Sequence, residues 1–561
     1  MTTEQKAASH PITASQSAWF DREVGWIRSN SRRAIWGAAG LLVLLAAYLG
    51  IVAKFATGPI NVFHNDALWM LDNGWRVLNG QVPHRDFYTP LGAFEYWILA
   101  WGMLLAHESA RGLAIGTSFF GAMVGVWAWL LCRRRLAPLP ALLITAWLVF
   151  TATCPAPLGF GPEFLSCAMI HNRQSYALLG IILVECAFAR SRARFGGGAS
   201  SGIALVLLGF LKLNFFGMAG LMLLASVPLQ RREISRLGGL LAGSAAASLS
   251  MAASLRFSLG AFLDDMSFVL HAHAPLTLSA TFAGAITCAK SGSVWLVILM
   301  MLGLIAFRSP AERWNRETVT HLFLGCLVLA SGPLFLQTNS LENKCTLAGL
   351  WIIILLDQVT AIHLRVPDKQ KQFTVALIAL GLGGIAVDLI PNLATAANLV
   401  NYQSAAIKSE GLRIDAPGME DVRFYNSTSF YDKMKTGDGD GTYYVGVLDD
   451  GLALLRAQSR PEESVFVLGF SNPFSYLLRR KPAHGGSSFL FIPTSITQNH
   501  MPAVDRVFGD ADLMMMPEYE STHHDGDQFI QNYYRSYLLQ NFRFVAKSKD
   551  WSLYRRNNPV R

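Results

Sequence analysis

The chain has 561 residues, of which 52% are hydrophobic and only 15% are charged, whereas soluble globular proteins carry about 25% charged residues. Long apolar runs separated by short basic loops indicate an α-helical, polytopic membrane protein in contact with membrane lipids. The net charge of +9 does not indicate a nucleic-acid partner, because most Lys and Arg residues stand beside apolar runs, where they orient membrane helices.

Residues 1–33 form a polar N-terminal segment that lacks the features of a cleaved signal peptide. The arginines Arg28, Arg32 and Arg33 come just before the first apolar run, which extends from Ala34 to about Ala56. Since basic flanks stay in the cytoplasm, we expect a cytoplasmic tail followed by a helix that runs outward.

The segment after the first helix, about residues 57–111, is expected to lie on the outer side. The next full-length apolar run, Gly112–Cys132, ends in the basic triplet 133–135, which places that end in the cytoplasm. The run Leu91–His107 between them is short and carries Glu95, so it is expected to lie in the outer interface or to re-enter from it. The alternative, a crossing at this run, would put the Arg triplet outside.

The same alternation continues to about residue 391. Five successive inner loops carry three basic residues each, and the outer connectors carry far fewer per residue. The pattern predicts about eleven spans within residues 34–391, a second long outer loop at about 258–292, a cytoplasmic N-terminus and an outer C-terminus. The spans expected after the first two are Leu139–Pro155, Ser175–Ala189, Gly202–Leu213, Asn214–Leu229, Leu237–Leu255, Val294–Phe307, Thr318–Leu336, Thr346–His363 and Phe373–Ile390.

From about residue 392 the composition changes, and residues 392–561 are expected to form a soluble α/β domain. Asp, Gly, Asn, Tyr and Pro become common, and apolar runs shorten to strand length. Ser464–Gly469 and Ala511–Met516 are candidate strands, and Phe544–Ala546 is expected to pair with Ser552–Tyr554. No cysteine follows Cys345, so this domain has no disulfide framework.

The first outer segment contains the most informative motif of the chain. It begins with an amphipathic pattern from His64 that carries Asp66 near its N-terminal end, and it continues as G-x-x-P-x-x-D-F-x-x-P-L from Gly80 to Leu91. This pattern resembles the first outer loop of the GT-C glycosyltransferase superfamily, in particular bacterial relatives of protein O-mannosyltransferases and aminoarabinose transferases.

The resemblance implies a multi-pass enzyme of the bacterial inner (plasma) membrane with a periplasmic C-terminal domain. Members of the superfamily take a sugar from a polyprenyl-phosphate carrier and use an Asp of the first outer loop in catalysis, which here is Asp66. Members often have Asp-Glu at this site, whereas this chain has Asp66-Ala67, so no role is carried over for a second acid.

Three further places agree with the resemblance less specifically. Glu163, in G-P-E after the third span, stands where relatives often carry a second outer-loop carboxylate. The stretch His171–Tyr176 is similar to a basic and aromatic stretch that opens the next helix. Lys212, in G-F-L-K-L-N, stands where relatives place a Lys at the outer end of a short span.

Sugar transfer with inversion needs a carboxylate that accepts the proton of the acceptor hydroxyl and cations that hold the leaving phosphate. Asp66 is the expected base, and Glu163 is the second candidate catalytic residue. The candidate substrate- or phosphate-binding residues are His84, Arg85, Asp86, Arg173 and Lys212. Asp86 and Glu163 are also candidates to orient the acceptor or a divalent metal, and the sequence indicates no certain cofactor.

Each of these residues has a structural alternative. Asp66 would also serve as a helix cap, and Asp86 would pair with its neighbour Arg85. Glu163 would also fit a solvated loop. Lys212 would extend to the outer face along its apolar stem, although ionisable groups at membrane depth are costly and tend to be functional.

The sequence therefore predicts a membrane glycosyltransferase that moves a hexosyl or pentosyl group from a polyprenyl-phosphate-linked donor to a glycan, lipid or protein acceptor on the periplasmic side. The alternatives are a multi-span transporter and a non-catalytic envelope-polysaccharide assembly protein. Transporters commonly show two related halves and helices broken at the midplane. This chain shows no internal repeat and few charges at the centres of its spans.

Overall fold

The computed structural model describes residues 31–558 except 134, 189–193, 231–233, 273–276, 309–312, 339–344, 365, 427–440, 487–488, 493–494 and 520–523. The chain divides into two units, Met1–Ala47 and Tyr48–Arg561. The described part of the first unit is the beginning of helix α2 (Ser31–Phe55). The other described helices and strands belong to the second unit.

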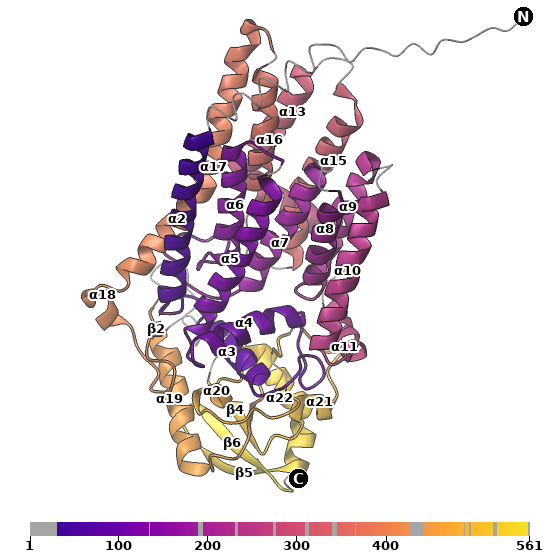
Figure 1. Cartoon of the computed structure of the whole chain (residues 1–561). Coiled ribbons are helices and arrows are strands. Elements are labelled where there is room, and N and C mark those ends of the chain that lie inside the picture. Colours follow the sequence, from indigo (N-terminus) through magenta and orange to yellow (C-terminus); the bar gives the residue numbers. More distant parts are fainter. Residues whose placement is uncertain are drawn as a thin grey trace, which may run out of the picture. The chain divides into compact units, whose positions relative to one another are not determined.

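Apolar helices make up most of residues 48–401 (Figure 1). They are α5 (Gly112–Cys132), α6 (Pro138–Thr153), α7 (Ile170–Ala187), α8 (Arg194–Gly209), α9 (Leu213–Gln230), α10 (Ile234–Ser254), α13 (Gly292–Phe307), α15 (Arg316–Thr338), α16 (Leu347–His363) and α17 (Asp368–Asn401), with the end of α2. α7 is buried at every residue and packs against α5, α6, α8, α9, α15 and α16. A helix buried on all sides forms the centre of such a bundle.

Four of these helices, α5, α10, α15 and α17, are long and apolar enough to cross a membrane. A fifth candidate is the pair α12 (Leu278–Ala289) and α13, which meet at an angle of 87°. The other helices are too short or, like α7 with its 18 residues, not apolar enough by this measure. The expected number of about eleven spans therefore stays a prediction.

The two long segments that are expected on the outer side contain helices of their own. α3 (His64–Leu78) is the amphipathic helix expected after the first span, and α4 (Ala93–Leu105) is the short apolar run that follows it. The second outer segment contains α11 (Leu259–Ala272) and α12.

The C-terminal part contains a small mixed sheet with the strand order β3-β4-β6-β5. The strands are β3 (Val465–Val467), β4 (Leu513–Pro517), β5 (Phe542–Lys547) and β6 (Trp551–Arg556), with β3 and β4 parallel and the other pairs antiparallel. The strands expected from the sequence are therefore present. The helices of this part are α18 (Ala405–Glu410), α19 (Gly441–Gln458), α20 (Phe474–Leu477), α21 (Val504–Phe508) and α22 (His524–Asn541).

The first outer segment and the C-terminal part share one hydrophobic core. β1 (Pro59–Ile60) pairs in parallel with β2 (Arg423–Phe424), and a single buried cluster combines α3 and α4 with α19, β3 and β6. Figure 1 shows α3 and α4 between the apolar helices and the strands of the C-terminal sheet. Helix α3, which carries Asp66, thus packs in one core with the C-terminal part.

Candidate functional site

Asp66 lies in the first turn of α3 and is the exception to the burial of that helix. Every residue from His64 to Val77 is buried except Asp66, which is half-buried. The helix begins after Phe63, whose backbone is left-handed with φ 53°, so Asp66 stands beyond the N-cap position. The positive end of the helix dipole stabilises a carboxylate in the first turn.

Asn61 joins the segment of Asp66 to the segment of Glu163. Its side-chain amide donates to the carbonyl of Glu163 at 2.7 Å, and its Oδ1 accepts from the amide of Leu165 at 2.7 Å. The Asn61 amide also donates to the carbonyl of Leu165 at 3.1 Å. The two predicted catalytic acids therefore come from neighbouring segments, and the Glu163 side chain is exposed.

Arg173, on α7, is fully buried and binds the loop that precedes its own helix. Its two terminal nitrogens donate to four carbonyls, those of Cys154, Ala156, Cys167 and Ala168, at 2.5 to 3.2 Å. This planar fork uses all four terminal N–H groups. Arg173 therefore shapes the loop through these four contacts.

Cys167 lies within electrostatic range of both Asp66 and Arg173. Burial raises the pKa of the Cys167 thiol to about 11, while the Arg173 guanidinium lowers it and the Asp66 carboxylate raises it further. The acid of the first outer segment and the cation of α7 thus act on the same thiol. Asp66 and Arg173, more than a hundred residues apart in the sequence, are therefore both close enough to this loop to affect the same side chain.

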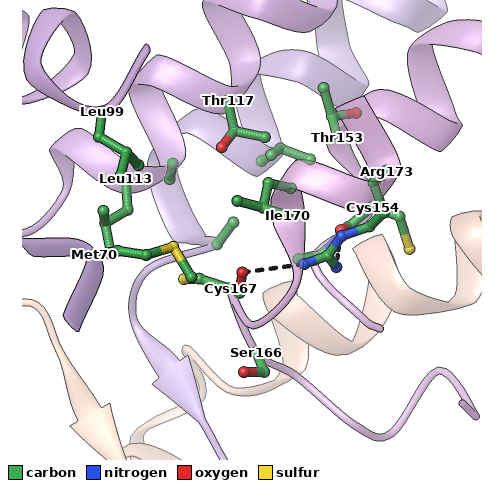
Figure 2. Close-up of a pocket in the computed structure, with 14 residues that line it drawn as sticks. Met70, Leu99, Leu113, Thr117, Thr153, Cys154, Ser166, Cys167, Ile170 and Arg173 are labelled. Atoms are coloured by element: carbon green, nitrogen blue, oxygen red, sulfur yellow. Dashed lines mark hydrogen bonds between the residues drawn. The ribbon is translucent and has the colours of Figure 1, made fainter. Parts of the chain in front are cut away.

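A small hollow lies beside this group (Figure 2). Its walls are mainly apolar and come from α2, α3, α4, α5, α6, α7 and the loop between α6 and α7, with Arg173 at one edge. Figure 2 shows the Arg173 guanidinium directed at the Cys167 carbonyl at this edge. The lining includes Val52, Ala56, Met70, Leu99, Leu113, Ile170, Thr117, Thr153 and Ser166.

Lys212, between α8 and α9, belongs to a second polar group with His171 and Asn172, the two residues that precede Arg173 on α7. The Lys212 ammonium donates to Asn172 Oδ1 at 2.7 Å, and the neighbouring His171 Nδ1 lies 3.5 Å from a carboxylate oxygen of Glu95. Glu95 is fully buried. Sequence reasoning did not select Glu95 or His171 as site residues, although ionisable groups in apolar runs are the signal that would have found them.

His84 lies in a junction of three distant segments. Its Nδ1 is 3.0 Å from Asp265 Oδ2 on α11, which also accepts from the Thr89 amide, and Arg506 donates to Asp265 Oδ1 at 2.5 Å. Burial lowers the pKa of the His84 imidazole, and the Asp265 carboxylate opposes this shift only in part. Burial raises the pKa of Asp265 despite these hydrogen bonds.

Arg85 and Asp86 form a two-point ion pair with each other at 2.8 and 2.7 Å. The Val82 amide also donates to Asp86 at 2.7 Å. Burial alone would raise the pKa of Asp86, but the hydrogen bonds from Arg85 and Val82 outweigh it and lower the pKa. The Arg85–Asp86 pair, which is the structural alternative to a site role for Asp86, is therefore present. These contacts stabilise the loop after α3.

Within the part of the chain that the structure describes, no group of three or more His, Cys, Asp or Glu side chains is placed to hold a metal ion. The divalent metal considered from the sequence thus has no defined set of ligands here.

No protein-family model and no curated protein matches the chain. Among solved structures, ArnT from Cupriavidus metallidurans bound to undecaprenyl phosphate aligns with 92% of this chain and 98% of its own, at 12% identity and a TM-score of 0.44. The apo form gives 13% identity and a TM-score of 0.42 over the same shares. The Archaeoglobus fulgidus oligosaccharyltransferase in complex with Zn and sulfate aligns with 84% of this chain and 67% of its own, at 11% identity and a TM-score of 0.37.

Both enzymes are GT-C membrane glycosyltransferases. This is the superfamily that the first outer loop resembles. Because the TM-scores are below 0.5 and the identities are low, no residue role, substrate or reaction is transferred from these alignments.

Proposed function

We propose that the chain is a GT-C-type membrane glycosyltransferase. It transfers a hexosyl or pentosyl group from a polyprenyl-phosphate-linked donor to a hydroxyl of a glycan, lipid or protein on the periplasmic side of the bacterial inner membrane. The observation that carries the proposal is the exposure of Asp66. It is the half-buried acid of an otherwise buried helix, next to a loop that borders an apolar hollow.

In this reaction Asp66 accepts the proton of the acceptor hydroxyl while the acceptor oxygen attacks the anomeric carbon of the sugar. The bond between that carbon and the phosphate oxygen breaks, and the polyprenyl phosphate leaves with the electron pair. Asp66 then releases its proton to water. The half-buried position supports this role, because the carboxylate of a base must contact the acceptor hydroxyl and must also be partly shielded from bulk water.

Lys212 is a candidate cation for the leaving phosphate. Its ammonium donates to Asn172 Oδ1 at 2.7 Å on α7, whereas the four terminal N–H groups of Arg173 donate to carbonyls of the loop before that helix. Charge-assisted hydrogen bonds to a developing phosphate are among the stronger polar interactions. Arg173 adds positive charge to the loop without being displaced.

The apolar walls of the hollow suit the lipid part of a polyprenyl carrier, and the polar edge at Arg173 suits its charged end. Glu163, which is exposed and near the segment of Asp66, is the candidate to orient the acceptor. No step requires a metal ion.

The test uses the full-length protein in lipid nanodiscs with a panel of polyprenyl-phosphate hexoses and pentoses labelled in the sugar. We expect Asp66→Asn to lower the rate of sugar transfer about 100- to 10,000-fold, the usual contribution of a general base. Asp264→Asn is the matched control, because Asp264 is an exposed acid of the other long outer segment. It should transfer sugar at the native rate.

Two results would contradict the proposal. Native protein that releases no polyprenyl phosphate from any donor of the panel would favour the non-catalytic assembly protein or the transporter. Transfer at the native rate by Asp66→Asn would remove Asp66 from the mechanism.

A further inference from the structure

The thiols of Cys288, in α12, and of Cys345, just before α16, lie against the same glycine of α15. A methyl group added to Gly332 would lie 2.8 Å from the sulfur of Cys288, and 3.3 Å from both the sulfur and the Cβ of Cys345. The distance between the two sulfur atoms therefore cannot exceed the sum of their distances to this methyl group. Both side chains are buried, at 3% and 1% exposure.

The surrounding packing holds both cysteines in place. α12 packs directly on α15 at Pro333, because a Cβ on Gly284, one turn before Cys288, would be 3.2 Å from the backbone of Pro333. Gln337 donates to Thr281 Oγ1 at 2.7 Å and fixes the same two helices. On the other side, the Cys345 thiol points at the Val328 carbonyl of α15 at 3.6 Å.

The sequence-based topology places both cysteines on the outer side of the membrane. Cys288 belongs to the outer segment of about residues 258–292, and Cys345 lies in the outer connector between the spans expected to end at Leu336 and to begin at Thr346. Cysteines on the periplasmic side of the membrane belong to an oxidising compartment, in which disulfides form and persist.

We propose that Cys288 and Cys345 form a disulfide bond that joins α12 to the start of α16 across α15. The two thiols lose two protons and two electrons, and the disulfide of a periplasmic thiol–disulfide oxidoreductase takes them up and becomes a dithiol. The inference rests on the outer orientation that the proposed function also requires. It is independent of Asp66 and of sugar transfer.

Gly332 explains how the two sulfur atoms approach each other. Any side chain at this position would occupy the space that they share, since its Cβ would lie within 3.3 Å of both. The bond would also hold α12 at its 87° angle to α13, because Cys288 stands at the end of α12, just before the two helices meet.

The test counts thiols in the full-length protein isolated from membranes without reductant. The protein is unfolded in detergent and treated with a maleimide–polyethylene glycol, which adds a visible mass to each free thiol. Of the seven cysteines, we expect two to be blocked before reduction and none after it. In Cys288→Ser and in Cys345→Ser, all six remaining thiols should react without reductant.

Cys326→Ser is the matched control, because Cys326 is an exposed cysteine of the same helix α15. It should keep two blocked thiols. Seven reactive thiols in the unreduced native protein would overturn the proposal, and so would two blocked thiols that persist in Cys288→Ser, since these would belong to another pair.

The failure of this inference is separable from the failure of the proposed function. Asp66→Asn should keep two blocked thiols, and Cys288→Ser should keep sugar transfer. If thiols become blocked only after oxidised glutathione is added to the solubilised protein, the bond does not form in the cell. That result would overturn the proposal and count against the outer orientation, without bearing on whether Asp66 is a base.

Discussion

At the residue scale, Arg173 is the side chain whose contacts define the loop between α6 and α7. Lysine in its place has a single ammonium group and cannot reach four carbonyls in a plane. We therefore expect Arg173→Lys to lower the free energy of unfolding by about 2–4 kcal/mol, because buried carbonyls lose their donors. Thermal unfolding in detergent measures this effect. Arg85→Lys, which alters a partly exposed ion pair, should change it by no more than about 1 kcal/mol, and equal effects of the two changes would contradict the assignment.

His84 should make the stability of the protein depend on pH. Burial lowers the pKa of its imidazole in the folded chain below the ordinary value of about 6.5, so the folded state keeps His84 neutral while the unfolded state takes up a proton. The stability linked to His84 is therefore fully present above about pH 6.5 and is lost as the pH falls below it.

His84→Asn removes this linkage and suits the left-handed backbone at φ 68°. The difference in unfolding free energy between the native protein and this variant should shrink by at most about 1.4 kcal/mol per pH unit below pH 6.5. Unfolding curves between about pH 8 and 5.5 measure it. A difference that is constant over this range would show that folding does not shift the titration of His84. Asp265 acts in the opposite direction, because its raised pKa favours the folded state as the pH falls.

At the element scale, α8 and α10 pack through two pairs of glycines spaced four residues apart. A Cβ on Gly198 or Gly202 would lie 2.0 or 2.3 Å from a carbonyl oxygen of α10, and a Cβ on Gly239 or Gly243 would lie 2.0 or 2.3 Å from one of α8. Such small-residue spacings let helix backbones approach closely in a membrane. The sequence analysis did not predict this helix pair, although the glycine spacing is the signal that would have indicated it.

Gly239→Ala should therefore separate α8 from α10 and lower the midpoint of thermal unfolding. Its neighbour is a matched control, since a Cβ on Gly238 would meet no atom within 4 Å. Gly238→Ala should leave the midpoint unchanged or raise it, because alanine favours a helix by about 1 kcal/mol over glycine. Similar midpoints for the two variants would contradict backbone contact between these helices.

Element positions followed well from hydropathy where a run had clear ends. Gly112–Cys132 is α5 with the same bounds, and the strand expected at Ser464–Gly469 contains β3. The last apolar helix was harder, because Pro391 was taken to mark the end of the membrane part. α17 instead continues through Pro391 to Asn401. A proline removes only one donor from a helix, so a long helix can pass through it with a local change of direction.

The site was less predictable than the elements. Asp66 could be selected because its motif is local, within one helix and the turn before it. The partners of Arg173 depend on the path of the loop between Cys154 and Ala168, and Asp265 meets His84 from 181 residues away. Such pairings arise from tertiary packing, which neither periodicity nor spacing records.

At the scale of the whole second unit, α3 connects the apolar helices to the C-terminal part. Arg76 pairs with Asp72 at 2.8 Å and donates to Gln81 and to the carbonyls of Ala483 and Gly485. Asp66 stands on the same helix, so these contacts also set the position of the proposed base. The C-terminal part thus helps to fix the position of α3 and of Asp66 on it.

The Asp72–Arg76 pair allows this support to be tested, because both side chains are at most 1% exposed. Burial raises the pKa of Asp72, and Arg76 opposes this shift. Arg76→Met would leave the carboxylate buried without its cation, so we expect a loss of about 3–5 kcal/mol in unfolding free energy and faster hydrogen exchange at residues 482–485. In the double variant Asp72→Leu with Arg76→Met, both charges are removed, and most of that loss should be recovered. A double variant no more stable than Arg76→Met would show that the lost hydrogen bonds of Arg76 to the C-terminal part, rather than the unpaired charge, account for the loss at this junction.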